Sequence, residues 1–282
     1  PAAWPPRAMP EVSGDALPVP YLAAPPAFIR IDRHRQLFVD DFLIDGTTME
    51  RHFHTARWLE ENPVLQPETP LEMGDGLAPC AAPFNDGCWF DGVQYRLYYH
   101  AGWMNGTALA VSDDGVHWVR KYADVQPGTN RVLLPTSGWR RDGAVIWLDR
   151  EAAAPEERYK AFHFFRTPEG EHAEVAISAD GIHFSAGTRT GPCGDNSSIF
   201  YNPFRKKWVY SIRANAQLPD GRYVRARRYF ECDDLIAGAA FHTEDTVFWQ
   251  RCDDMDRLLC EPGIQFPQAY PPQLYDLNCA AY

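Results

Sequence analysis

One seven-residue pattern occurs twice and constrains the fold more than any other feature of the chain. Residues 112–118 (SDDGVHW) return as residues 178–184 (SADGIHF), with Ser, Asp-Gly, an aliphatic residue, His and an aromatic residue at fixed spacing. An Asp-Gly pair flanked by strand-forming residues predicts a hairpin turn, because the glycine adopts positive φ. We therefore expect two copies of one strand-turn unit, in which both histidines have structural roles, orienting the turn or covering a sheet edge.

A second repeat places an aspartate in front of a buried strand. Residues 140–149 (RRDGAVIWLD) and 195–202 (DNSSIFYN) each carry an aspartate, Asp142 or Asp195, seven residues before an Asp or Asn. The apolar, β-branched and aromatic run between the two polar positions is typical of a buried strand. We expect residues 140–143 to form a turn that delivers Asp142. Because the strand and the acid return together, the pattern indicates radial repetition around a shared centre, as in a β-propeller.

The spacing of these repeats predicts an all-β chain that covers about three blades and the start of a fourth. Blade one is expected over residues 84–118, blade two over 142–184 and blade three over 195–230, and a fourth unit begins at 274–279. A propeller needs at least about four blades. We therefore expect a fragment, or a chain whose remaining blades come from the rest of a longer polypeptide or from a partner chain.

The first 35 residues differ in composition from the rest. Residues 1–35 are rich in Pro and Ala and are expected to form an extended arm, since proline disfavours both helix and central strand. Residues 36–282 are assigned to the propeller domain, incomplete at its C-terminus. Within it we expect a strand, or a strand and turn closing on two acids, at 36–44 and a strand at 51–58. Short helical pieces are expected only at 150–158 and 233–240.

Composition excludes several classes of function. The net charge of −11 would repel a polyanion, so nucleic acid is not an expected partner. No apolar run approaches the ~20 residues that span a bilayer, so no membrane contact is expected. The seven cysteines include no CxxC pair, and we expect no metal or other cofactor. Buried free thiols are expected, with one or two disulfides as the alternative, and both cytoplasmic and secreted locations stay open.

Carboxylates at the strand starts carry the functional hypothesis. In a propeller the start of each innermost strand lies at the mouth of the central funnel. Asp142, Asp195 and Asp276 occupy that position in successive blades, and Asp86 is expected on the same face in blade one. Converging acids shift one another's pKa, so one holds a proton while another stays ionised. Glycoside cleavage needs that arrangement, and we expect these four residues to be catalytic.

A second set of residues is expected to bind the substrate, because arginine can grip a hydroxyl or neutralise the acids and an aromatic ring can stack on a sugar. This set is Asp75, Glu72, Arg140, Arg141 and Trp103. The identity of the general acid stays open among Glu72, Glu261 and residues of the remaining blades. Glu231 is disfavoured, since the repeat phase places it at an outer hairpin, at the position of Ser112 and Ser178.

These motifs carry a family resemblance. Arg141-Asp142-Gly143 resembles the Arg-Asp-Pro element of the five-bladed propeller glycoside hydrolases, the superfamily of invertases and arabinanases, with Gly in place of Pro. Residues 36–44 (QLFVDDFLI), the Asp-Gly-x-His turns and residues 200–209 (FYNPFRKKWV) resemble a group of uncharacterised bacterial proteins labelled glycosyl-hydrolase-like. The resemblance spans most of the chain from residue 30 on. It implies a propeller fold and a sugar substrate.

The sequence thus predicts a glycoside hydrolase that cleaves its carbohydrate substrate in a funnel by paired carboxylates. Two alternatives stay open. One is a carbohydrate-binding propeller without catalysis, in which the acids only bind hydroxyls or cap strands. The other is a glycoside phosphorylase, which needs basic groups around a phosphate; Arg140 and Arg141 are the only hint of these in the sequence.

Overall fold

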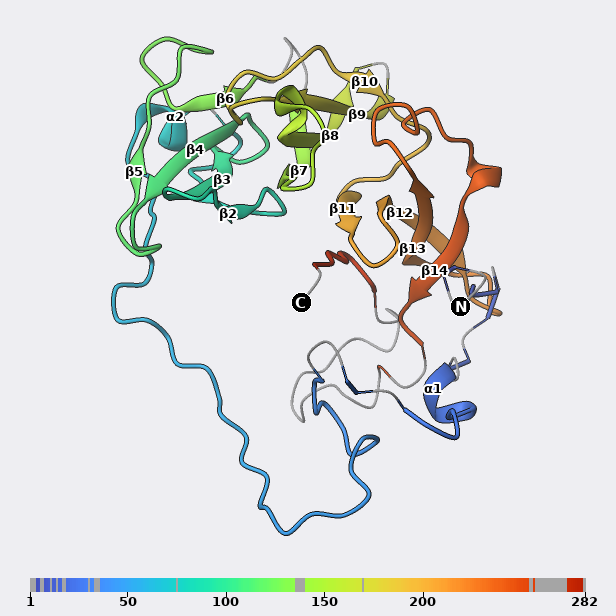
Figure 1. The fold of residues 1–282 in the computed structure, drawn as a ribbon. Helices are drawn as coiled ribbons and strands as arrows, with labels where there is room; N and C mark the ends of the chain where they lie inside the picture. Colours follow the sequence, from blue (N-terminus) through green and yellow to red (C-terminus); the bar gives the residue numbers. More distant parts are fainter. Residues whose placement is uncertain are drawn as a thin grey trace.

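The computed structural model describes residues 4–5, 8–10, 12–13, 15–16, 19–29, 31–32, 36–74, 76–134, 140–168, 170–253, 256 and 273–280. Three antiparallel sheets stand side by side in an arc around a centre that the C-terminal segment approaches (Figure 1). The described residues hold two short helical turns, α1 (Pro20–Ala23) and α2 (Pro70–Gly74), neither of which is long enough to cross a membrane. The fold is all-β, with the sheets arranged as three blades of a β-propeller, as predicted.

Sheet one has an innermost strand in two pieces. Its strands are β1 (Ala81–Ala82), β2 (Cys88–Phe90), β3 (Tyr95–Ala101), β4 (Thr107–Ser112), β5 (Val119–Arg120) and β6 (Arg131–Leu133). Both β1 and β2 pair with β3, so residues 83–87 interrupt the innermost strand. Asp86 lies in this interruption.

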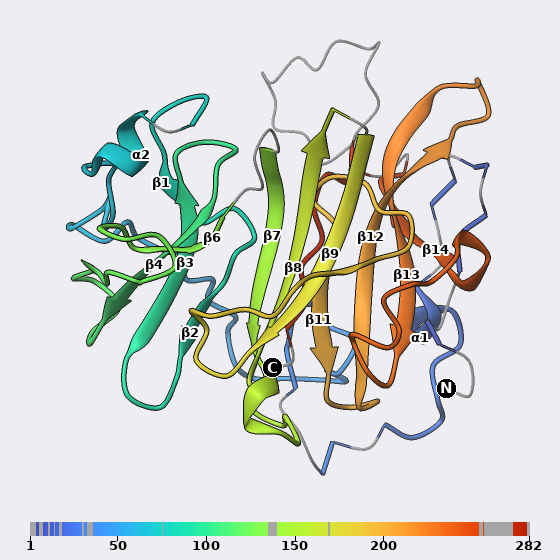
Figure 2. The ribbon, with the colours of Figure 1, turned by 90° about the horizontal axis from the view of Figure 1, so that it is seen from above.

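Sheets two and three each have four strands. Sheet two runs β7–β8–β9–β10 from the centre outward, and sheet three runs β11–β12–β13–β14 (Figure 1). Figure 2 shows β7, β8 and β9 side by side. The bounds are β7 (Arg140–Leu148), β8 (Tyr159–Thr167), β9 (Gly170–Ser178), β10 (Thr188–Arg189), β11 (Ser198–Asn202), β12 (Lys207–Gln217), β13 (Tyr223–Cys232) and β14 (Val247–Arg251). Short 3₁₀ turns lie at Pro155–Glu157 and Thr243–Asp245. The β12–β13 hairpin is longer than β11 and extends beyond its start.

Alternation along β7 explains how the sheets pack. Successive side chains of a strand point to opposite faces, so Val145 joins the core between sheets two and three while Ile146 joins the core between sheets one and two. The first core includes Phe162, Phe164, Ile199, Trp208, Tyr210 and Ile212. The second includes Tyr98, Leu109, Leu148 and Tyr159. The inner strand of sheet two therefore has apolar side chains on both faces, as its sequence predicts.

The repeated turn has the same hydrogen bonds in both copies. The Ser112 hydroxyl accepts a hydrogen bond from the Gly115 amide at 2.8 Å. The Asp114 carboxylate accepts one from the His117 amide at 2.8 Å and lies 2.7 Å from His117 Nδ1. Residues 178–183 repeat these contacts at 2.9, 2.9 and 2.7 Å. The two glycines have φ of +79° and +73°, so the predicted turn and the structural role of both histidines are confirmed.

Several expected elements differ from the structure. Residues 36–44 and 51–58 form no strand, because no described sheet edge takes their backbone hydrogen bonds, and Phe53 and Trp58 are almost fully exposed. Residues 140–143 are not a turn but belong to β7, with the pairing shifted between Arg141 and Ala144. Residues 233–240 form turns rather than a helix, and β14 was not expected.

The two chain ends lie against sheet three. In the arm, Met9 is buried against Ala216 and Val224, and its amide donates to the Phe248 carbonyl at 2.9 Å. Within the arm, which was expected to be extended, residues 20–23 form one helical turn that begins with proline, a residue that the first position of a helix tolerates. Residues 273–280 form no strand in the described part of the chain. The six described cysteines are free, and Cys88 is exposed.

Candidate active site

Asp142 is positioned by the irregularity in β7. The shifted pairing between Arg141 and Ala144 takes Asp142 and Gly143 out of the regular ladder. A side chain at Gly143 would lie 3.1 Å from the Asn196 Cα, so glycine lets β7 approach the segment before β11. His100 Nε2 lies 3.0 Å from the Asp142 carbonyl oxygen and holds this backbone from sheet one. The bulge therefore brings Asp142 beside the start of sheet three.

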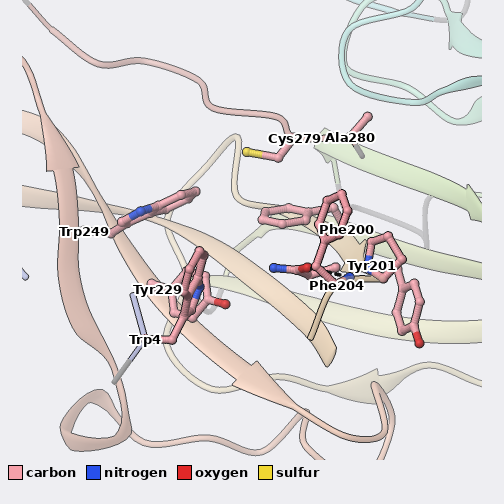
Figure 3. Close-up of a pocket in the computed structure, with 10 residues that line it drawn as sticks. Trp4, Phe200, Tyr201, Phe204, Tyr229, Trp249, Cys279 and Ala280 are labelled. Carbon is pink, nitrogen blue, oxygen red and sulfur yellow. Dashed lines mark hydrogen bonds between the residues drawn. The ribbon is translucent and has the colours of Figure 1, made fainter. Parts of the chain in front are cut away.

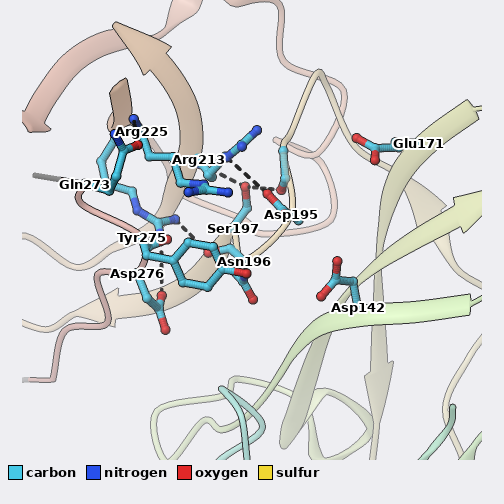
Figure 4. Close-up of polar contacts among 12 residues, drawn as sticks. Asp142, Glu171, Asp195, Asn196, Ser197, Arg213, Arg225, Gln273, Tyr275 and Asp276 are labelled. Atoms are coloured by element: carbon cyan, nitrogen blue, oxygen red, sulfur yellow. Dashed lines mark hydrogen bonds and ion pairs between the residues drawn. The ribbon is translucent and has the colours of Figure 1, made fainter. Parts of the chain in front are cut away.

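Arg166 joins the acids of sheets two and three. It lies on β8, and its Nη2 donates to Asp142 Oδ2 at 2.8 Å and to Asp195 Oδ2 at 3.0 Å. Since both oxygens lie within hydrogen-bonding distance of one nitrogen, they are at most about 6 Å apart. Figure 4 shows the two carboxylates on facing elements. The predicted convergence of Asp142 and Asp195 is thus present in the structure.

Asp276 joins the same rim through Arg227. The Arg227 guanidinium is buried; it donates to the Asn196 carbonyl at 2.6 Å and to Asp276 Oδ1 at 3.3 Å. Burial raises the pKa of Asp276, and the nearby Arg227 charge only partly offsets this. Asn278 Nδ2 lies 3.1 Å from both Asp276 Oδ2 and Asn85 Oδ1, which connects the rim to sheet one. Contacts from all three sheets therefore meet around these acids.

Asp86 does not share the rim of Asp142, Asp195 and Asp276, contrary to prediction. Asp86 and Arg141 are both buried and form a direct ion pair inside the molecule. Asp86 also accepts the Phe84 amide at 3.0 Å. The Asp86 side chain has no exposed surface, whereas those of Asp142 and Asp195 keep 8% and 13% of theirs. Asp86 therefore cannot reach a substrate, and Arg141, almost as enclosed, cannot grip one. Arg141 instead neutralises a buried acid beside Asp142.

Glu72 is likewise part of the scaffold, which contradicts its expected substrate contact. It is fully buried and accepts Arg120 Nε and the Tyr99 hydroxyl, each at 2.7 Å. Burial alone would raise its pKa, but hydrogen bonds from Arg120 and from the Thr69 and Glu68 amides outweigh it and lower the pKa to about 2. A carboxyl group that stays ionised at neutral pH is also unsuited to be the general acid.

The other sequence candidates have varied surroundings. Arg140 is exposed at the first residue of β7, and Trp103 is partly buried with its ring edge-on to Phe84 and His100. Glu231 lies at the end of β13 and pairs with Arg205, consistent with a place outside the acid rim. Asp75 and Glu261 lie outside the described residues. Among the described residues no group of His, Cys, Asp and Glu could hold a metal ion.

The residues that sequence reasoning missed are mostly arginines. Arg166, Arg213 and Arg227 contact the rim acids, and Arg213 Nε lies 3.1 Å from Asp195 Oδ1 as an ion pair without hydrogen-bond geometry. A signal was present in residues 225–228 (RARR), where arginine stands at alternate positions of a strand and so on one face.

A separate pocket lies on the face of sheet three that points away from sheet two. Its volume is about 190 Å³, and its lining is almost entirely apolar (Figure 3). The lining includes Trp4, Phe200, Phe204, Tyr229, Trp249 and Cys279. It contains no carboxylate and is therefore distinct from the acid rim.

No model of a known protein family matches the chain, and no curated protein matches its sequence. Among solved structures, the chain is similar to a β-fructofuranosidase from Schwanniomyces occidentalis complexed with fructosyl-erythritol (16% identity, TM-score 0.40, covering 55% of this chain and 32% of that one). It is also similar to an α-L-arabinofuranosidase from Clostridium thermocellum (12%, 0.38, 60% and 51%). A third similar structure is an assumed glycoside hydrolase from Parabacteroides distasonis (13%, 0.41, 70% and 63%). The chain thus spans less than two thirds of the length of each of these three proteins.

Proposed function

We propose that the protein is a glycoside hydrolase whose reacting groups are Asp142, Asp195 and Asp276. One observation carries the proposal: carboxylates from two neighbouring sheets share the single Arg166 nitrogen and so lie at most about 6 Å apart. Carboxyl groups at such separations can flank one glycosidic bond. Asp276 extends the same rim through Arg227.

The chemistry divides among the three acids. Asp276 is the proton donor, because burial raises its pKa and so favours the protonated form that protonates a leaving oxygen. Of the other two, one carboxylate attacks the anomeric carbon or activates a water molecule, and the other stabilises the positive charge that develops on the sugar ring. Arg166, more than a third exposed, neutralises the pair in the free protein and shifts when the sugar enters.

A binding function without catalysis is the second candidate. Arg166 occupies both Asp142 and Asp195, and a third acid, Glu171, also pairs with it. Acids held in such a network bind hydroxyl groups through the same oxygens without reacting. A screen that measures binding and hydrolysis separately distinguishes the two candidates.

The test is a panel of aryl glycosides and polysaccharides assayed with the unaltered protein and three variants. Asp142→Asn and Asp195→Asn are expected to lower hydrolysis at least about a hundredfold while leaving the melting temperature nearly unchanged. Asp233→Asn is the matched control, since Asp233 is exposed and, in the part of the chain that the structure describes, its ion-pair partner is Lys207 alone. Sugar binding without hydrolysis would establish the binding function instead. A large loss of stability in either active-site variant would mark that acid as structural.

A further inference from the structure

Two arginines stand above Asp195 on one face of the β12–β13 hairpin. Arg213 pairs with Arg227 across the two strands, and Asn215 pairs with Arg225, so Arg213 and Arg225 are diagonal neighbours on the same face. This part of the hairpin extends beyond the start of β11, where Asp195 lies. Figure 4 shows both side chains beside the acid rim.

Among the described residues, Arg225 is the arginine of this site that pairs with no carboxylate. Arg166, Arg213 and Arg227 each pair with a carboxylate of the rim, but among the described residues none pairs with Arg225. Its guanidinium lies over the Tyr275 ring at 4.9 Å, and its Nε is buried without a hydrogen-bond partner. Its backbone amide donates to the Gln273 side chain at 2.8 Å, and its carbonyl accepts a hydrogen bond from the Leu274 amide at 3.3 Å.

Arg213 also has N–H donors that are not used in hydrogen bonds. Its contact with Asp195 lacks hydrogen-bond geometry, and its Nε is buried without a partner. An arginine fork binds a planar anion with two parallel hydrogen bonds. The Arg213 and Arg225 guanidinium groups lie side by side, and Arg225 has no carboxylate partner among the described residues. A neutral ligand would leave their N–H donors without a charged acceptor.

We propose that the substrate is an acidic sugar whose anionic group, a uronate carboxylate or a sulfate ester, binds between Arg213 and Arg225. This inference rests on the proposed function for the place of the scissile bond, which lies at the neighbouring Asp142–Asp195 pair. The anion sits on the hairpin side of Asp195, and the sugar ring extends from it toward the acids. The Tyr275 ring supports the Arg225 fork from behind.

Binding is measured by calorimetry with D-glucuronate, D-galacturonate, glucose 6-sulfate, D-glucose, and inorganic sulfate and phosphate. At least one acidic sugar is expected to bind at least about tenfold more tightly than glucose, since hydrogen bonds to charged groups are the stronger kind. Arg225→Gln should remove most of that preference. Arg222→Gln is the matched control, because Arg222 pairs with Asp220 at the distant end of the same hairpin. Equal affinity for glucose and all acidic sugars, or binding of inorganic phosphate or sulfate alone, would overturn the proposal.

Arg225 also packs on Tyr275, so its removal could disturb residues 273–280. Arg225→Lys keeps the positive charge over the ring but loses the fork, and it should reduce the preference for a uronate while leaving the melting temperature unchanged. Hydrolysis of paired aryl glucuronides and glucosides separates this inference from the proposed function. Binding of an acidic sugar without any hydrolysis would leave the anion site standing and remove the hydrolase. Hydrolysis with no preference for the acidic substrate would support the hydrolase and rule out the anion site.

Discussion

Replacing Asp86 with asparagine keeps the size of the side chain and removes the negative charge that faces Arg141. Both partners are buried, and two further nitrogens of the Arg141 guanidinium already lack hydrogen-bond partners. The substitution therefore leaves a buried cation with no counter-charge. Breaking a buried ion pair from one side costs about 3–5 kcal/mol, a large share of the roughly 5–15 kcal/mol that stabilises a typical folded protein.

Urea unfolding followed by circular dichroism measures this effect. Asp86→Asn should lower the free energy of unfolding by about 3–5 kcal/mol, whereas Asp142→Asn should cost less, because its partner Arg166 is more than a third exposed and also pairs with Asp195 and Glu171. The double variant Asp86→Leu with Arg141→Met should recover much of the loss, because it leaves no charge in the core. A loss below about 1 kcal/mol in Asp86→Asn, or a double variant as unstable as the sum of the single ones, would refute the reasoning.

Three further predictions concern the turns and the first sheet. Gly181→Ala should destabilise the protein by at least about 1–3 kcal/mol more than Gly115→Ala, because only at Gly181 would the added carbon collide with a neighbouring tyrosine; equal losses in thermal melts would contradict this. Glu72 has a lowered pKa and so stabilises the fold above its unfolded value of about 4.3, losing this effect as pH falls toward 2. Glu72→Gln should therefore flatten the decline in melting temperature over that range, and an unchanged slope would count against the ion pair. His183 has a pKa raised by hydrogen bonds to Asp180 and Asp124, so its contribution is present below about pH 6.5 and lost as pH rises through the folded value. NMR titration should show the raised midpoint, and Asp180→Asn should return it toward that of a free histidine.

Local chemistry in the sequence was enough to predict the blades. The Ser-x-Asp-Gly turns form the same hydrogen bonds twice because every group in them lies within six residues, so no distant partner is needed. The apolar run after Asp142 predicts a strand buried on both faces, and β7 packs on both sides as expected. Residues 36–44 and 51–58 have strand-like patterns without strands, since a strand also requires a neighbour for its backbone groups.

The candidate active site was predictable in part from the sequence. The phase of the repeats correctly brought Asp142 and Asp195 together, because a strand start has the same place in each blade. The exclusion of Asp86 and Glu72 could not be foreseen, since it depends on Arg141 and Arg120 from other strands. Pairings of this kind between distant positions leave no periodic trace in a single sequence. The role of Arg166 was missed for the same reason.

The innermost strands are irregular at the places where the acids stand. Asp86 lies in the gap between β1 and β2, Asp142 lies at the shifted pairing of β7, and Asp195 precedes a residue with φ of +54° ahead of β11. Backbone at these points contributes little to the ladders that hold each sheet together. Exchanging the side chains of Asp142 or Asp195 therefore disturbs few of the backbone hydrogen bonds that build the sheets. The residues at these points can therefore vary while the three sheets keep their pairing.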